Sequence, residues 1–244
     1  SNIEKDYKWL NENNSFKCEI TNKSDEYSLL ALQGPQSLEL IKQISNSNIS
    51  ELKYYNFIIG NIGEIKDVII SRTGYTGELG YELYVKNSFI TDLWNVLFST
   101  NIQLKPIGLA ARDTLRLEKG YCLYGNEIND FTSPIEADLT WITKFNKNFV
   151  GKDIIHKVYK EGRTKKLVGI ELLDKGIARK DYKIYSPTKQ IEIGYVTSGT
   201  MSPSLNKPIA LAYVDIKYSD INTIVEISVR NKKIKSKVIN LPFI

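Results

Sequence analysis

The sequence predicts an α+β protein in which antiparallel sheets packed with helices are followed by a small C-terminal β-barrel or jelly-roll-like domain. Short alternating or β-branched runs recur along the chain between turn-forming residues. Amphipathic helical spacing is confined to the first part of the chain, and residues 151–244 consist of short strands with polar turns. We therefore expect two domains, residues 1–150 and residues 151–244, with the polar segment FNKNFVGKD (145–153) at their boundary.

In the first domain, apolar positions show either a period near 3.6 or strict alternation, and these patterns predict helices and strands respectively. Gly34-Pro35 ends one strand and opens a helix, for which we expect a packing role rather than anion binding. The predicted elements are a helix over 1–13, strands over 16–20 and 27–33, a helix after residue 37, a hairpin of strands 54–60 and 65–71, a strand over 81–85, and helices over 89–98 and 106–120.

In the second domain, six short strands are expected from alternation and turn residues. They cover residues 167–172, 182–185, 191–197, 208–214, 223–229 and 234–239, and Asn231 lies at the tip of the last hairpin.

The amino-acid composition limits the classes of protein to which this chain can belong. With 42% hydrophobic residues the chain can bury a core, and no apolar run approaches the length of a membrane span or a signal-peptide core. Cys18 and Cys122 follow no metal-site spacing, so we expect buried free thiols in a reducing compartment. His156 is the one histidine; it rules out a multi-histidine metal site and is expected on the surface.

Charge is unevenly distributed. Residues 151–244 hold 18 lysines and arginines against nine acidic residues, whereas residues 1–150 hold 15 against 19. The basic C-terminal part suggests an acidic partner, although a solvated lysine-rich surface is the preferred explanation. A nucleic-acid module is disfavoured, because the basic residues are not interleaved with aromatic ones in a recognised pattern.

The segment SRTGYTGELG (71–80) is the first candidate for a binding site. Glycines 74, 77 and 80 surround Tyr75 and Glu78, which predicts sharp turns beside an aromatic ring and a carboxylate. Further on, Arg112 and Arg116 lie four residues apart and hence on one face of a helix that ends at Lys119-Gly120. Such groups suit a polar, partly anionic small molecule.

Longer motifs carry a family resemblance that covers essentially the whole chain. TGYTGE and GLAARDTLRLEKGYCLYGNEI, supported by LLALQGPQS, SPIEADLTW, FVGKD, LVGIEL and SGTMSP, resemble the aminomethyltransferase (T-protein) of the glycine cleavage system. The resemblance implies that family members begin with a further N-terminal segment, roughly a third of their length, that is not present here. That segment carries the aspartate thought to be catalytic, so the catalytic residue is unknown within this sequence.

The resemblance implies binding roles for five residues. Glu78 would hold the amidine-like edge of tetrahydrofolate, Arg112 its glutamyl carboxylates, and Tyr121 and Trp141 would line the folate pocket, while Tyr75 shapes the glycine turn. From the residues alone the alternatives are a structural salt bridge for Glu78, an ion pair or loop cap for Arg112, and ordinary core for the two rings. Arg116 is expected to be an ion-pair partner.

The resemblance also implies a reaction and a partner. An aminomethyl group carried on the lipoyl arm of H-protein would release ammonia and pass its carbon to tetrahydrofolate, forming 5,10-methylene-tetrahydrofolate. The implied location is the bacterial cytoplasm or the mitochondrial matrix, with neither membrane nor nucleic acid as partner and no metal. A folate-binding, non-catalytic accessory protein is the alternative. Accessory proteins of this kind are expected to carry a KGCYxGQE-like motif. In this sequence the corresponding cysteine, Cys122, is shifted by one position relative to that motif.

Overall fold

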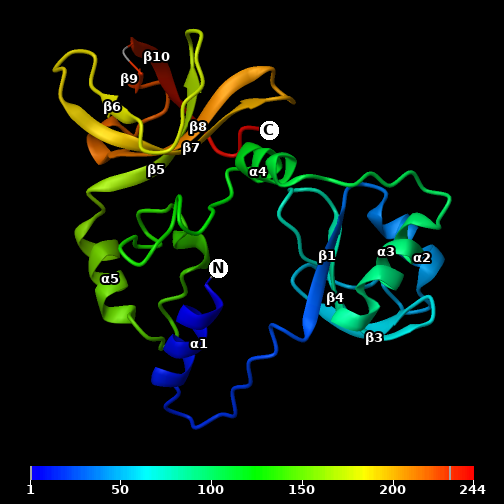
Figure 1. The fold of residues 1–244 in the computed structure, drawn as a ribbon. Coiled ribbons are helices and arrows are strands. Elements are labelled where there is room, and N and C mark those ends of the chain that lie inside the picture. Colours follow the sequence, from blue (N-terminus) through cyan, green and yellow to red (C-terminus); the bar gives the residue numbers. More distant parts are fainter. Residues whose placement is uncertain (1, 231) are drawn as a thin grey trace. The chain divides into compact units, whose positions relative to one another are not determined.

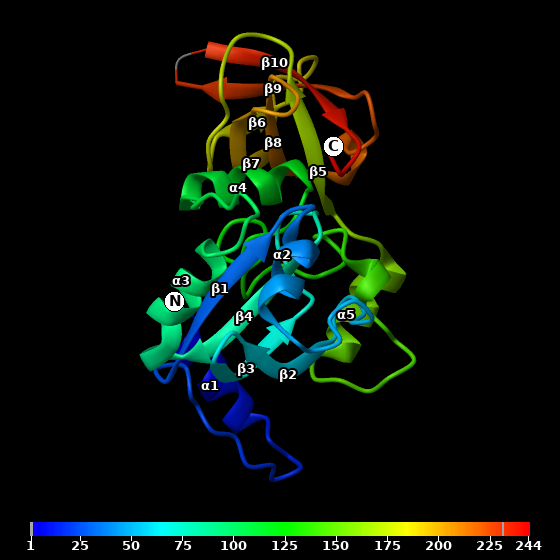
Figure 2. The ribbon, with the colours of Figure 1, turned by 90° about the vertical axis from the view of Figure 1, so that its right-hand side faces the viewer.

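A computed structural model describes residues 2–230 and 232–244, and Asn231, expected at a hairpin tip, lies outside them. The chain forms two compact units, one up to Ile107 and one from Gly108 onward. Each unit contains a sheet (Figures 1 and 2). The domain boundary expected near residue 150 stays a prediction.

The first unit is built on a four-stranded antiparallel sheet in the order β1-β4-β3-β2. Its strands are β1 (Tyr27–Gln33), β2 (Phe57–Ile62), β3 (Ile65–Ser71) and β4 (Gly80–Lys86). The expected hairpin is confirmed, and Ile62 pairs with Ile65 across a two-residue turn. The helices are α1 (Ile3–Glu12), α2 (Ser37–Ile44) and α3 (Ile90–Phe98), the last preceded by the 3-10 helix η1 (Asn87–Phe89).

Alternation along the strands builds the core of this unit. Alternate residues of β4, Tyr81, Leu83 and Val85, are buried and pack with the apolar stripes of α2 and α3. Leu40 and Ile41 of α2 and Leu93 of α3 are buried in the same cluster. The amphipathic helices and the alternating strands therefore bury their apolar residues in one core, as expected.

Two expectations near the N-terminus were wrong. Residues 16–20 form no strand, although their sequence alternates, and Cys18 is exposed rather than buried. Alternation produces a strand only where a neighbouring strand supplies hydrogen bonds, and this segment pairs with none of the described strands. The helix α1 forms as expected but has no buried residue.

The second unit contains a closed six-stranded barrel, β10-β5-β8-β7-β6-β9, with antiparallel neighbours. All six strands expected from the sequence are confirmed. They are β5 (Lys165–Leu172), β6 (Lys183–Tyr185), β7 (Glu192–Ser202), β8 (Lys207–Asp215), β9 (Ile224–Val229) and β10 (Lys232–Ile239), with the 3-10 helix η3 (Ile216–Tyr218) after β8.

Strand β8 is buried on both faces and links the barrel to a helix. Ala210, Ala212 and Val214 belong to the barrel core, whereas the intervening Leu211 and Tyr213 pack in a second cluster with Leu117. Leu117 lies on α4 (Leu109–Glu118), which follows the predicted helix closely but begins three residues after Pro106. Packing on both faces explains the continuous apolar run of β8.

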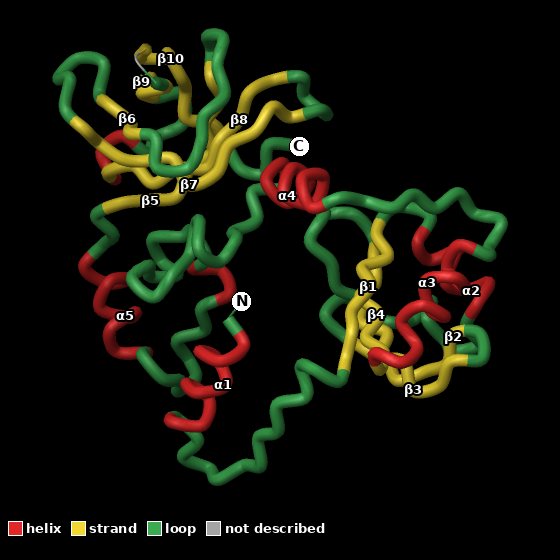
Figure 3. Tube along the Cα trace, viewed as in Figure 1, coloured by secondary structure: helices red, strands yellow, loops and turns green. Residues whose placement is uncertain are grey.

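The segment between α4 and the barrel is mostly irregular, as Figure 3 shows, and contains the 3-10 helix η2 (Thr140–Ile142) and the helix α5 (Lys152–Glu161). The helix α5 was not expected from the sequence. His156 of α5 is half-buried, and its ring lies 4.7 Å from the ring of Phe145, centroid to centroid, so it is partly exposed at the surface. Among the described helices, none combines the length and the hydropathy of a membrane span.

Two isoleucines of β9 test the barrel core. Ile227 is 0% exposed and Ile224 is 36% exposed. We expect Ile227→Ala to lower the free energy of unfolding by about 2–5 kcal/mol, because it removes buried methylenes and leaves a cavity. Ile224→Ala, the matched control, should cost less than about 1 kcal/mol. Urea denaturation measures both, and equal losses would contradict the closed barrel.

Candidate functional site

The glycine loop, residues 72–80, joins β3 to β4 in the first unit. Its first and last glycines, Gly74 and Gly80, both lie against the side chain of Gln33 at the end of β1. A Cβ atom would lie 2.1 Å from the Gln33 Oε1 at Gly74 and 2.2 Å from it at Gly80. A side chain at either position would displace the Gln33 amide, so glycine permits this close approach of the backbone to the amide.

The Gln33 amide is hydrogen-bonded at both ends. Its Nε2 donates to the carbonyl oxygens of Thr73 (3.2 Å) and Tyr81 (3.3 Å), and its Oε1 accepts from the hydroxyl of Thr76 (3.2 Å). Gln33 was not expected at the site, although LLALQGPQS was among the motifs that carried the family resemblance. The sequence shows no sign that this glutamine and the distant glycines meet.

The loop presents Glu78 at its tip and Tyr75 on its side. Glu78 is exposed and Tyr75 is half-buried. Within the described part of the chain, the Glu78 carboxylate forms no ion pair. The alternative of a structural salt bridge for Glu78 is thus not supported, and its carboxylate is available to a ligand.

The helix α4 carries both arginines and ends as the sequence predicts. Gly120 adopts φ +70°, its N–H donates to the Leu117 carbonyl, and the N–H of Tyr121 donates to the Arg116 carbonyl. This pair of bonds is the Schellman motif, in which glycine is preferred because φ is positive. Arg112 is exposed on the helix, whereas Arg116 is fully buried. The two residues therefore do not form a shared arginine fork.

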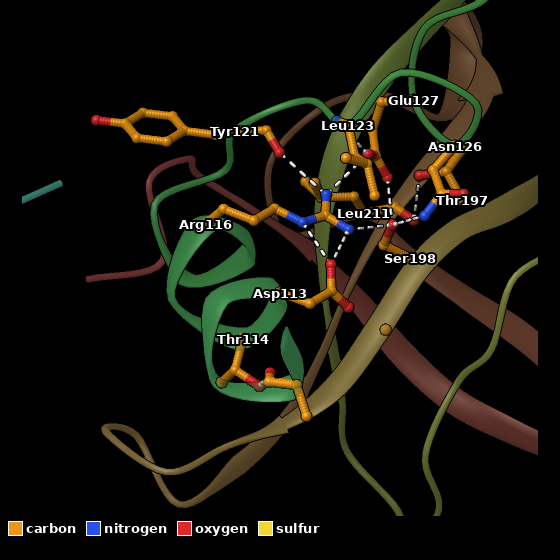
Figure 4. A network of polar contacts seen from close by, with 12 residues as sticks. Asp113, Thr114, Arg116, Tyr121, Leu123, Asn126, Glu127, Thr197, Ser198 and Leu211 are labelled. Atoms are coloured by element: carbon orange, nitrogen blue, oxygen red, sulfur yellow. Dashed lines mark hydrogen bonds and ion pairs between the residues drawn. The ribbon is translucent and has the colours of Figure 1, made fainter. Parts of the chain in front are cut away.

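Arg116 is the centre of a buried network, drawn in Figure 4. Its Nη1 donates to Glu127 Oε2 (2.8 Å) and to the Tyr121 carbonyl (3.0 Å), and its Nη2 donates to Ser198 Oγ (2.7 Å). Asp113 accepts from Nε at 2.8 Å. The expectation that Arg116 is an ion-pair partner is confirmed.

Like the Arg116 guanidinium, the Glu127 carboxylate has several hydrogen-bond partners, and both of its oxygens accept. It also accepts from the Leu123 N–H (2.9 Å) and the Ser198 hydroxyl (2.6 Å), and Asn126 donates to the same hydroxyl oxygen at 3.1 Å. A buried ion pair is tolerated when additional hydrogen bonds satisfy both charges. The network thus fixes the 121–127 segment against α4 and β7.

A second carboxylate of α4 reaches the same barrel strand. Glu118 is buried, and its carboxylate accepts from the hydroxyls of Ser202 (2.5 Å) and Ser204 (2.9 Å) and from the Ser204 N–H (3.2 Å). The helix is therefore held to β7 and the residues after it by two separate polar links. Neither Glu118 nor Ser198 was singled out from the sequence.

The remaining expected site residues lie in the second unit. Tyr121 is half-buried, and in Figure 4 its ring points away from the network while its carbonyl faces Arg116. Trp141, on η2, is 67% exposed, so the alternative that it is ordinary core was wrong. Tyr75 and Glu78 come together on the loop, and Tyr121 follows the helix that carries Arg112. That these residues line one folate pocket stays a prediction.

Cys122 lies beside the network and faces the barrel. It is half-buried and packs against the cluster formed by Leu117, Leu211 and Tyr213. Burial, together with the nearby Glu127, raises the pKa of the Cys122 thiol to about 11, although Arg116 acts in the opposite direction. A thiol with such a pKa is a poor nucleophile near neutral pH.

Comparison with known proteins identifies the family. The family model of the GCVT N-terminal domain matches residues 1–147, and that of the glycine cleavage T-protein C-terminal barrel domain matches residues 165–244. The aminomethyltransferases of Flavobacterium psychrophilum and Halothermothrix orenii are 46% and 47% identical to this chain, covering all of it and 68% of their own lengths.

A crystal structure agrees with these matches. Glycine cleavage system aminomethyltransferase T from Bartonella henselae superposes with a TM-score of 0.90 at 32% identity, over the whole chain and 66% of that protein. The relatives are thus transferases that share this fold. The chain belongs to the glycine cleavage T-protein family, and it spans about two thirds of the length of the relatives that it matches.

The buried ion pair gives a stability prediction. Glu127→Ala should lower the free energy of unfolding by about 3–5 kcal/mol, because it leaves the Arg116 guanidinium buried without its partner. The matched control is Glu161→Ala, which breaks an exposed pair with Lys157 and should cost less than about 1 kcal/mol. Denaturant unfolding measures both, and a loss as small as the control's would contradict the network.

Cysteine alkylation tests the two thiol environments. Iodoacetamide at pH 8 should modify the exposed Cys18 quickly and Cys122 slowly, because only about one Cys122 thiol in a thousand is ionised three units below its pKa. The Cys122 rate should rise as pH increases toward 11, as the thiolate fraction grows. Mass spectrometry of peptides measures each site, and equal rates at pH 8 would contradict the environment described for Cys122.

Proposed function

We propose that this chain carries the tetrahydrofolate-binding part of an aminomethyltransferase of the glycine cleavage system. The observation that supports this most directly is the exposed Glu78 carboxylate, held on a loop whose backbone is braced on both sides by Gln33. Membership of the T-protein family supports the same proposal. A rigid, charged acceptor at a loop tip is suited to orient a planar ligand.

Glu78 would bind the amidine-like edge of the reduced pterin. A carboxylate accepts two parallel N–H bonds from such an edge, and this geometry fixes the plane of the ring as well as its position. Charge-assisted hydrogen bonds of this kind contribute about 1.5–3 kcal/mol each. The contact would therefore determine both affinity and the orientation of N5 and N10.

We also propose folate-binding roles for Arg112, Tyr121 and Trp141, and a supporting role for Tyr75. The Arg112 guanidinium would pair with carboxylates of the glutamyl tail. The rings of Tyr121 and Trp141 would stack on flat parts of the ligand, which aromatic side chains with one exposed face favour. Tyr75 would shape the glycine loop beside Glu78.

In the proposed reaction, the aminomethyl group arrives on the lipoyl arm of H-protein, ammonia leaves, and the carbon passes to tetrahydrofolate as 5,10-methylene-tetrahydrofolate. The folate nitrogen is itself the nucleophile, so the protein's task is to orient N5 and N10 and to exclude water. The residues of this chain would perform the binding and orienting. The catalytic aspartate is expected in the N-terminal segment of the family.

H-protein is the proposed partner, and the proposed location is the bacterial cytoplasm or the mitochondrial matrix. The basic residues of the second unit would suit an acidic partner surface. Several of them, however, are engaged within the barrel: Lys183 pairs with Glu192 at 2.8 Å and Lys207 with Glu171 at 2.8 Å. The partner surface is therefore expected to depend on the remaining lysines.

Folate binding tests the proposal. Tetrahydrofolate at 100 times its Kd should stabilise the chain by about 2.7 kcal/mol, seen as a rise in Tm. Glu78→Gln should weaken binding by about 10–100-fold, the equivalent of one charge-assisted bond. The control Glu39→Gln, an exposed residue paired with Lys42, should leave the Tm shift unchanged.

Turnover separates catalysis from binding alone. Aminomethylated H-protein and tetrahydrofolate are supplied, and methylene-tetrahydrofolate formation is followed. Binding without turnover would favour the accessory-protein alternative or a requirement for the further segment of the family. The absence of any folate-dependent Tm shift would overturn the proposed function.

A further inference from the structure

We propose that Gln33 is the positioning residue for Glu78, and that it sets folate affinity by holding the glycine loop in its binding conformation. The inference rests on the proposed function, because it concerns how the loop presents Glu78 to a reduced pterin. Gln33 lies on β1, far from Glu78 in sequence, and nothing in its motif identifies this role.

The contacts of Gln33 reach both ends of the loop. The Nε2 donates to the carbonyls of Thr73, just after β3, and of Tyr81, the second residue of β4. One amide thus bridges the two stems, which are also joined by the β3–β4 pairing that ends at Ser71 and Glu82. Because Nε2 has two hydrogens, each carbonyl receives its own donor.

A short relay connects Gln33 to the loop tip. The Thr76 hydroxyl donates to Gln33 Oε1 at 3.2 Å, and its oxygen accepts from the backbone N–H of Glu78 at 3.3 Å. The orientation of the Glu78 backbone, and hence the direction of its side chain, is coupled to the amide through one residue. Glu78 itself is exposed, so no core packing holds it.

The slot that holds the amide has no spare room. Side-chain atoms at residue 74 or residue 80 would overlap with the Gln33 amide, as the Cβ positions show. The Gln33 amide therefore keeps its present position only while glycines occupy positions 74 and 80. Three glycines in seven residues (74–80) would otherwise leave the loop with many conformations.

The residues that follow Gln33 hold the far side of the loop. The Gly34 N–H (2.8 Å) and the Ser37 hydroxyl (3.1 Å) both donate to the Leu79 carbonyl. The QGPQS segment therefore contacts the stems and the end of the loop, and Thr76 connects Gln33 to the backbone of Glu78. Preorganisation of this kind raises affinity by reducing the ordering that binding requires.

The experiment uses Gln33→Met, which keeps the length of the side chain but removes its hydrogen bonds. The matched control is Gln36→Met, since Gln36 is exposed and its side chain caps nothing. Tetrahydrofolate binding to the full chain is titrated anaerobically by calorimetry, and Tm is measured without ligand. We expect Gln33→Met to weaken binding about tenfold and the control to leave it unchanged.

A double-mutant cycle distinguishes positioning from general destabilisation. If Gln33 acts through Glu78, adding Gln33→Met to Glu78→Gln should weaken binding less than twofold further, because the contact being positioned is already lost. A residue that only stabilises the fold would weaken binding equally in both backgrounds. Equal effects in the two backgrounds would overturn the inference.

Threonine variants keep the test decisive if Gln33→Met fails to fold. Thr76→Val removes the relay hydroxyl but keeps its shape, and it should reproduce the non-additivity with Glu78→Gln. Thr76→Ser, which restores the hydroxyl, should return binding to within about twofold of wild type. If Glu78→Gln itself leaves binding unchanged, the proposed function fails. If Glu78→Gln weakens binding but Thr76→Val does not, only the positioning inference fails.

Discussion

The Arg116–Glu127 ion pair is the interaction on which the second unit most depends. Both side chains are fully buried, so each charge has lost its hydration and must be compensated inside the protein. Asp113 on the helix α4 accepts a hydrogen bond from Arg116. The Leu123 N–H, in an irregular segment, and the Ser198 hydroxyl, on the barrel strand β7, donate to Glu127. Three parts of the chain are thereby held in one arrangement, and Arg112 and Tyr121 take their places from it.

In the first unit, a neutral side chain instead of an ion pair holds a segment in place. A glycine-rich loop has little side-chain packing of its own, and the Gln33 amide supplies the two donors and the acceptor that it needs. A neutral amide brings no charge that would compete for Glu78. The carboxylate at the tip stays unpaired among the described residues, whereas a charged side chain in the same slot would alter its electrostatics.

Much of the fold was predictable from residue periodicity. The six barrel strands, the hairpin of β2 and β3, and the helices that end at Phe98 and near Gly120 agree with the sequence analysis to within a few residues. The failures were of two kinds. Residues 16–20 alternate but have no strand to pair with, and α5 went unrecognised because the FNKNFVGKD segment suggested a boundary and its polar residues were taken for loop.

The candidate site was predictable only in part. Its exposed residues, such as Glu78 and Trp141, stand in motifs that the family resemblance carries, and their exposure agrees with a binding role. The residues that hold them were not recognised. Gln33 stood in LLALQGPQS, which served only for the family resemblance, and Glu127 and Ser198 were ordinary members of longer matches.

The sequence by itself determined most of the secondary structure, the order of an α+β unit and a barrel, and the family. These depend on local periods and on motifs that are contiguous in the chain. Tertiary structure alone decided that Arg116 is internal while Arg112 is exposed, and that Gln33 meets the glycine loop. The physical reason is separation, since Arg116 meets Ser198 across 82 residues and Gln33 meets Thr76 across 43. No local pattern specifies which distant group will satisfy a buried hydrogen bond.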